Sequence, residues 1–157
     1  MATRTVAGVD LESLLPAVNR SPVHYRQAAA DPRLDPAGLD ALAGSPYPFV
    51  RLAVAQQPRT GPGALLRILD SEFSVWDTNH LLRVLAAHPR ADREVLLRVL
   101  ERVTGLLAHR VVRPYSAALA LAGRPELEPA ELQVLATMPG TSRKVRRQLA
   151  EILVARG

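Results

Sequence analysis

The sequence predicts an all-α fold, a short helical-repeat solenoid of about four helix pairs with capping helices at its ends and no sheet. Three observations lead to this prediction. A pattern of alanine, proline and leucine recurs four times, prolines fall where helices should end or begin, and apolar residues between them return at helical spacing. A unit of two short helices cannot bury its own apolar face, whereas stacked units can, so the pattern favours a solenoid.

Each copy of the repeat is defined by a proline. An alanine lies three residues before it, a leucine seven residues after it and another aliphatic residue ten after it. In three copies a second proline lies four residues after the first. The members are Pro32, Pro58, Pro89 and Pro125; Ala29, Ala55, Ala86 and Ala122; Pro36, Pro62 and Pro129, with Arg93 as the exception; Leu39, Leu65, Leu96 and Leu132; and Leu42, Ile68, Val99 and Leu135.

Each position has a mechanical reason. The first proline ends a helix, because it lacks an N–H and disfavours a helical residue before it. The second proline suits the first position of the next helix, where the missing N–H costs nothing. The small alanine allows a close approach between helices, and the two aliphatic residues, three apart, share a helix face.

The order Ala-x-x-Pro, a proline four residues later and Leu-x-x-Leu resembles the leucine-rich repeat variant family, over about Tyr25 to Leu135. The resemblance implies alternating α-helices and short 3₁₀-helices in a right-handed superhelix without strands. The repeat prolines are 26, 31 and 36 residues apart, so the later repeats are closer to the longer helix pairs of HEAT or armadillo proteins. One member of the family carries an iron–sulfur cluster on cysteines, which this sequence lacks.

The expected elements follow in chain order. A capping helix covers 9–18, and four repeats cover about 21–45, 46–71, 72–103 and 104–137. Their helices are expected at 24–30 and 36–43, at 52–57 and 62–69, at 78–87 and 92–103, and at 115–122 and 129–137. A stiff link is expected at 46–48, insertions at 72–79 and 105–114, a break at Pro139-Gly140, and a C-terminal capping helix at 142–155.

Composition limits the function classes. The 157 residues suit a single domain, and no cysteine means no disulfide, thiolate chemistry or Cys-ligated metal. With no apolar run suited to a signal peptide or membrane span, we expect a cytoplasmic, non-membrane protein; coding bias suggests a bacterial source. The net charge is +5, and residues 79–157 carry 13 Arg or Lys against 7 Asp or Glu, which favours anionic partners.

No catalytic motif is present, so we expect no enzyme, no cofactor and no metal site. The four histidines, His24, His80, His88 and His109, lack metal-ligand spacing with a third ligand nearby. An accessory domain of an enzyme, or a glycosylase-like repeat domain, is a minor alternative.

Three groups are candidates for partner binding. Arg33, Arg59 and Arg90 each follow the repeat proline directly, in a row ended by Glu126. They form either a solvated face or a ladder for phosphates and carboxylates. The second group comprises Arg143, Lys144, Arg146 and Arg147 at the start of the last helix, where positive charge opposes the helix dipole. Solvent and Glu151 can offset this charge, or an anionic partner can.

The third group is Phe73 and Trp76 in the first insertion, which either fill a seam between unequal repeats or anchor a partner. Together these features predict a non-enzymatic protein–protein interaction or scaffold module whose partner is an acidic protein. The alternative is binding of the nucleic-acid backbone through an arginine-rich face.

Overall fold

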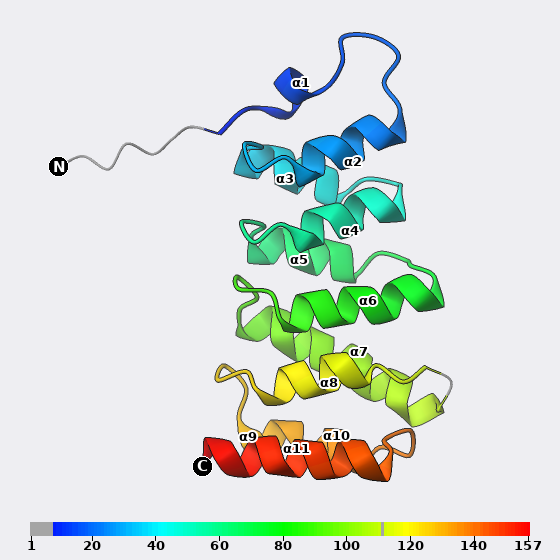
Figure 1. Ribbon diagram of the computed structural model, residues 1–157, viewed down its shortest axis with the longest axis vertical. Helices are drawn as coiled ribbons and strands as arrows, with labels where there is room; N and C mark the ends of the chain where they lie inside the picture. Colours follow the sequence, from blue (N-terminus) through cyan, green and yellow to red (C-terminus); the bar gives the residue numbers. More distant parts are fainter. Residues whose placement is uncertain (1–7, 111) are drawn as a thin grey trace, which may run out of the picture. The chain divides into compact units, whose positions relative to one another are not determined.

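The computed structural model describes residues 8–110 and 112–157, and its regular elements in these ranges are helices (Figure 1). An isolated bridge joins Val9 to Leu34, and no sheet forms within the described ranges. The all-α prediction is therefore confirmed. The helices are α1 (Leu11–Leu14), α2 (Pro22–Ala30), α3 (Pro36–Ala43), α4 (Pro48–Gln56), α5 (Pro62–Leu69), α6 (Val75–Ala86), α7 (Arg93–His109), α8 (Tyr115–Ala122), α9 (Pro129–Leu132), α10 (Val134–Thr137) and α11 (Arg143–Arg156).

The chain divides into two compact units, residues 1–68 and 69–157. In the first unit α4 packs on both α2 and α3. In the second unit α8 packs between α6 and α11, and α7 contacts α6, α8 and α10. Figure 1 shows α6, α8 and α11 as one row of the second unit, with α7, α9 and α10 behind them. The core of this unit lies between the two rows.

The recurring apolar positions form that core and the core of the first unit. The four alanines that precede the repeat prolines have no exposed surface. The aliphatic residues seven and ten positions after each of these prolines are at most 4% exposed. The prediction that Leu39, Leu65, Leu96 and Leu132 occupy buried positions is therefore confirmed.

Each proline turn contains an equivalent main-chain hydrogen bond. In each, the N–H two residues after the proline donates to the carbonyl of the residue before it, at 3.0–3.2 Å. The donors are buried in every case. The pairs are Leu34 to Asp31, Thr60 to Gln57, Ala91 to His88, Leu127 to Arg124, and Thr141 to Met138. The last pair surrounds Pro139, so the break predicted there is a fifth copy of the turn.

Both expected insertions are helical in part, over 75–79 in the first and over 105–109 in the second. Ser74 caps α6 by accepting from the N–H of Asp77, so α6 begins at Val75 and not at Thr78. Helix α7 continues to His109, through Gly105. The glycine, which disfavours a helix by about 1 kcal/mol relative to alanine, suggested an end there. Leu107 lies one turn beyond Val103 on the same buried stripe, and its burial outweighs that cost.

Smaller differences concern helix ends. Helix α1 covers only Leu11–Leu14 of the expected 9–18. The expected stiff link includes Pro48, which is the first residue of α4. The helix expected at 129–137 is interrupted at Gln133, between α9 and α10. Among the described residues, no helix combines the length and apolar character needed to cross a membrane.

The alanine positions can be tested with neighbouring substitutions. Ala29 has no exposed surface, whereas Ala30, the last residue of the same helix, is exposed. We expect Ala29→Leu to lower the free energy of unfolding by about 1–3 kcal/mol, because the larger side chain overpacks a helix contact. Ala30→Leu should change it by less than about 0.5 kcal/mol. Urea unfolding of both variants measures the difference, and equal losses would contradict a close contact at Ala29.

Candidate functional site

The two arginines of the predicted row that lie in the first unit, Arg33 and Arg59, have different roles. The guanidinium of Arg59 donates from Nη1 to the carbonyl of Leu34 and from Nη2 to that of Asp31, at 3.4 Å. Both carbonyls belong to the preceding proline turn. Arg33 instead pairs with the Asp31 carboxylate at 2.9 Å, and its side chain is 66% exposed. Arg59 therefore joins two turns, while Arg33 remains at the surface.

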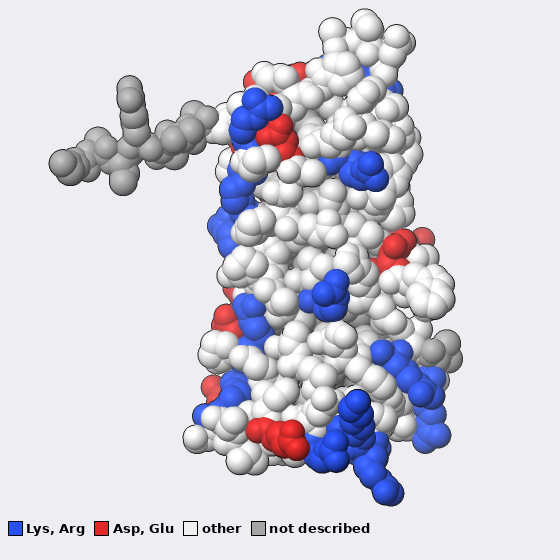
Figure 2. Space-filling view, in the orientation of Figure 1, with Lys and Arg blue, Asp and Glu red and all other residues white. Residues whose placement is uncertain are grey.

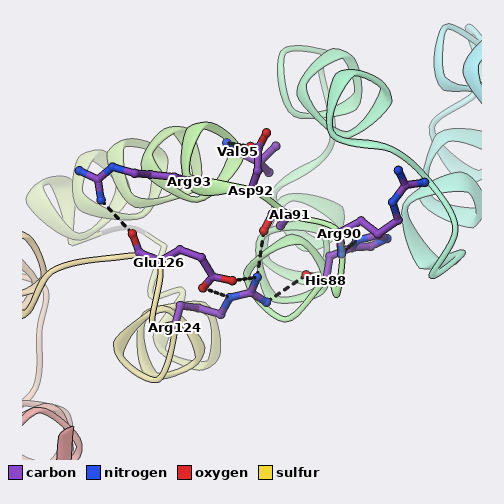
Figure 3. A network of polar contacts seen from close by, with 8 residues as sticks. All are labelled: His88, Arg90, Ala91, Asp92, Arg93, Val95, Arg124 and Glu126. Carbon is purple, nitrogen blue, oxygen red and sulfur yellow. Dashed lines mark hydrogen bonds and ion pairs between the residues drawn. The ribbon is translucent and has the colours of Figure 1, made fainter.

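The second unit repeats the tie between turns with other arginines (Figure 3). Arg124 donates to the carbonyls of His88 and Ala91, both at 2.9 Å, and pairs with the Glu126 carboxylate at 3.0 Å. Arg156 donates to the carbonyls of Ala122, at 2.9 Å, and Leu127, at 2.6 Å. These arginines are structural, because their N–H groups satisfy main-chain acceptors of the neighbouring turn.

Sequence reasoning missed Arg124 and Arg156 because they do not share a repeat position. Arg59 follows its proline, Arg124 precedes its proline, and Arg156 lies at the end of α11. Arg90, which does share the position of Arg59, is exposed, and its main-chain N–H donates to Nδ1 of His88 at 3.0 Å. Glu126, expected to end the row, holds Arg124 in place.

The basic cluster of α11 lies at the surface. Its four cations, Arg143, Lys144, Arg146 and Arg147, are all exposed. Arg147 approaches Glu151 at 3.9 Å, with both side chains about 70% exposed, and Arg146 lies 3.4 Å from the Met138 carbonyl. The side chains of Arg143 and Lys144 form no hydrogen bond or ion pair with another described residue. The sequence therefore located this cluster correctly on the first turns of a helix.

Three helix ends meet beside this cluster. The hydroxyl of Tyr115, the first residue of α8, donates to the carbonyl of Gly140, whose N–H donates to the carbonyl of Leu107 in α7. The beginnings of α8 and α11 and the last turn of α7 are thereby held together. Figure 2 shows Lys and Arg side chains gathered over this region, at the lower right of the view.

We call the exposed cations at these helix ends the basic end of the second unit. It consists of Arg110, Arg113, Arg143, Lys144, Arg146 and Arg147. The side chains of Arg110 and Arg113 also form no hydrogen bond or ion pair with another described residue. An acidic group of a partner would therefore find guanidinium N–H donors directed to solvent at this end.

Trp76 is on the surface and not in a seam. Its side chain is 85% exposed and the adjacent Val75 is 57% exposed, at the start of α6. Phe73 is half-buried. The core-filling interpretation is therefore wrong for Trp76, because the early start of α6 places the indole on the outer side of the helix. A partner anchor remains the interpretation that its exposure favours.

Within the described residues, no three His, Cys, Asp or Glu side chains lie close enough together to hold a metal ion. Two of the four histidines, His24 and His88, accept main-chain N–H groups in local turns. Nδ1 of His24 accepts the Ser21 N–H at 3.0 Å, and Nδ1 of His88 accepts the Arg90 N–H.

Comparisons with protein-family models, curated proteins and solved structures found no match to the chain.

The tie made by Arg124 can be tested against an exposed cation of the same unit. Arg124→Gln shortens the side chain and leaves two turn carbonyls without their donor, so we expect a loss of about 1–3 kcal/mol in the free energy of unfolding. Arg143→Gln should cause no such loss, because it removes an exposed charge that opposes the dipole of α11. Thermal and urea unfolding give both values; a loss from Arg143→Gln as large as that from Arg124→Gln would contradict the assignment.

The ion pair between Arg33 and Asp31 lowers the pKa of the Asp31 carboxyl group. Hydrogen bonds from the side chain and main chain of Arg33 lower the pKa of Asp31 from 3.8 to about 2. A lowered folded-state pKa means that the pair contributes stability above the unfolded pKa, and that this contribution is lost as the pH falls from about 4 through about 2. Arg33→Gln should raise the Asp31 pKa towards its ordinary value. Carboxyl NMR titration measures the shift, and an unchanged pKa would contradict the pairing.

Proposed function

We propose that the chain is a non-enzymatic protein-interaction module that binds an acidic protein through the basic end of its second unit. The observation that carries this proposal is the cluster on the first turns of α11, whose cations are exposed and lack strong partners among the described residues. Arg59, Arg124 and Arg156 use their donors on main-chain carbonyls, whereas the donors of this cluster are open to a partner.

The position of the cluster strengthens the argument. Each exposed positive charge near a helix N-terminus opposes the helix dipole by about 0.3–1 kcal/mol. Ser142 caps α11 by accepting the Val145 N–H, so the helix start already has its local stabilisation. The cations do not contribute to it. Carboxylates of a partner would offset both the dipole effect and the mutual repulsion of the four side chains.

We further propose that the chain is a helical-repeat protein of the leucine-rich repeat variant type, with helix pairs stacked in a right-handed sense. The alanine and leucine positions and the five equivalent proline turns support this proposal. Stacked repeats offer broad surfaces on which a protein partner can dock. The exposed Trp76 would add an apolar contact to a basic surface.

Nucleic-acid binding is the second candidate, and the six cations of the basic end favour it. The donor groups of Arg59 and Arg124 are directed to carbonyls, so these side chains cannot also follow a phosphate backbone without breaking turn contacts. A compact basic end suits a local acidic surface better than a long duplex. We therefore place the acidic protein first.

A double variant tests the proposal. Arg143→Gln with Lys144→Gln should weaken capture of an acidic partner from host extract by about tenfold or more, because two charge-assisted contacts are lost. The control is Arg26→Gln with Arg98→Gln, which removes the same charge from α2 and α7, although Arg98 is paired with Asp70. Nuclease treatment of the extract and quantitative mass spectrometry identify the partner, whose affinity is then measured directly.

A salt series separates the two candidates. Binding to duplex DNA should weaken with a slope of about 0.9 in log affinity per phosphate neutralised. An acidic protein should lose association rate with salt while keeping its apolar contacts. Unchanged capture of every partner by the α11 double variant would contradict both candidates at this surface.

A further inference from the structure

A small cavity opens between α6 and the start of α8 in the second unit. Its volume is about 190 Å³, and it is lined by Asn79, His80 and Arg83 of α6 and by the segment 113–117. This volume is well below the ~300–1,000 Å³ of pockets for drug-sized ligands. The cavity therefore suits a single small group and not a nucleotide or a large cofactor.

The cavity has a cationic lining. Both Arg83 and Arg113 line it, and no described carboxylate does. Nη2 of Arg83 lies 3.1 Å from Nδ1 of His80, a contact in which the arginine donates and which orients its guanidinium. The Arg113 side chain forms no hydrogen bond or ion pair with another described residue. Two guanidinium groups thus face one cavity without an anion supplied by the surrounding described residues.

The remaining wall adds hydrogen-bond donors. Pro114 precedes α8 and provides no side-chain acceptor for the N–H groups of the first turn. The N–H of Tyr115 donates to the Arg113 carbonyl and that of Ala118 to the Pro114 carbonyl, while Ser116 and Ala117 lie at the cavity wall. The Ser116 hydroxyl is exposed. Ser116 therefore supplements the two arginines on which the site rests, whereas the N–H groups of Tyr115 and Ala118 are already bonded.

We propose that this cavity binds one phosphate group. A carboxylate has two acceptor oxygens and one charge, which a single arginine satisfies. A phosphate monoester carries about −1.5 to −2 charges and three acceptor oxygens, which two guanidinium groups and neighbouring N–H or O–H donors match. The proposal relies on the proposed function only for the source of the phosphate, either a phosphorylated side chain of the protein partner or free phosphate.

Trp76 favours the first source. Trp76, His80 and Arg83 lie four and three residues apart on α6, and therefore along one side of the helix. An indole that is 85% exposed is thus placed about one turn from the cavity. A peptide that carried the phosphate into the cavity could lie across this aromatic surface, whereas inorganic phosphate would not use it.

The test uses two probes and two matched double variants. Calorimetry and ¹⁵N NMR on the full chain would follow inorganic phosphate and a short neutral peptide containing phosphoserine, with the unphosphorylated peptide as reference. We expect saturable binding of a phosphate probe, with the NMR shifts centred on residues 79–83 and 113–117. Arg83→Gln with Arg113→Gln should weaken it at least tenfold. Arg143→Gln with Lys144→Gln, which removes the same charge, should change it less than threefold.

The outcomes separate the sources and the hypotheses. Tighter binding of the phosphopeptide, reduced by Trp76→Ala, identifies a phosphorylated partner; binding of inorganic phosphate alone identifies the free ion. No saturable binding, or equal weakening by the two double variants, would overturn the phosphate site. Since no partner protein is present, that failure would leave capture by the α11 cluster intact. If the Arg83 and Arg113 variant does not fold, Arg113→Gln alone decides the matter, because its side chain bonds to no other described residue.

Discussion

The fold depends on arginine side chains that reach from one proline turn to the main-chain carbonyls of the turn before it. Arg59 does this in the first unit and Arg124 in the second, while Arg156, at the end of α11, donates to the carbonyls of Ala122 and Leu127. Each turn satisfies its own buried N–H internally, but its carbonyls have further acceptor capacity. A guanidinium is always charged and presents five donors in a planar fork, so one residue can serve two carbonyls.

The bonds from arginine to the turn carbonyls and the small alanines both affect the contact between facing helices. The proline fixes where a helix ends, and the arginine holds that end against the next one, so the facing helix surfaces meet at a set separation. Only a small side chain fits there, which agrees with the complete burial of Ala29, Ala55, Ala86 and Ala122. In the second unit Glu126 adds a carboxylate that holds Arg124 in the required orientation (Figure 3).

The sequence predicted the fold where local chemistry decides it. Proline ends and starts helices through its own geometry, so the bounds of α3, α5 and α8 were predictable from Pro36, Pro62 and Pro125. The sequence did not predict the end of a helix where burial in the core outweighs helix propensity. Gly105 indicates an end of α7 by itself, yet Leu107 packs into the core and draws the helix onward. Pro139 was not recognised as a turn of the same kind because it lies only 14 residues after Pro125.

Predicting the site was limited by a different constraint. A shared position in a repeat states where a Cα atom lies along the chain, but not the direction of a long side chain. Arg33 and Arg59 share that position, although one pairs at the surface and the other bonds to carbonyls. The α11 cluster was predictable because its four cations are close in sequence. The cavity was not, since Arg83 and Arg113 come from separate elements.

The distinction between bound and available arginines separates those that stabilise the fold from those that could take part in the recognition we propose. An arginine within reach of a turn carbonyl exchanges its hydration for fixed acceptors, and its donors are no longer available to a ligand. At the joined ends of α7, α8 and α11 the nearby carbonyls already accept main-chain or tyrosine donors, as those of Leu107 and Gly140 do. Arg113 and Arg143, whose side chains bond to no other described residue, keep donors that an external anion could accept. Arg124 therefore belongs to the fold, whereas the exposed donors of Arg113 and Arg143 support the binding role that we propose for them.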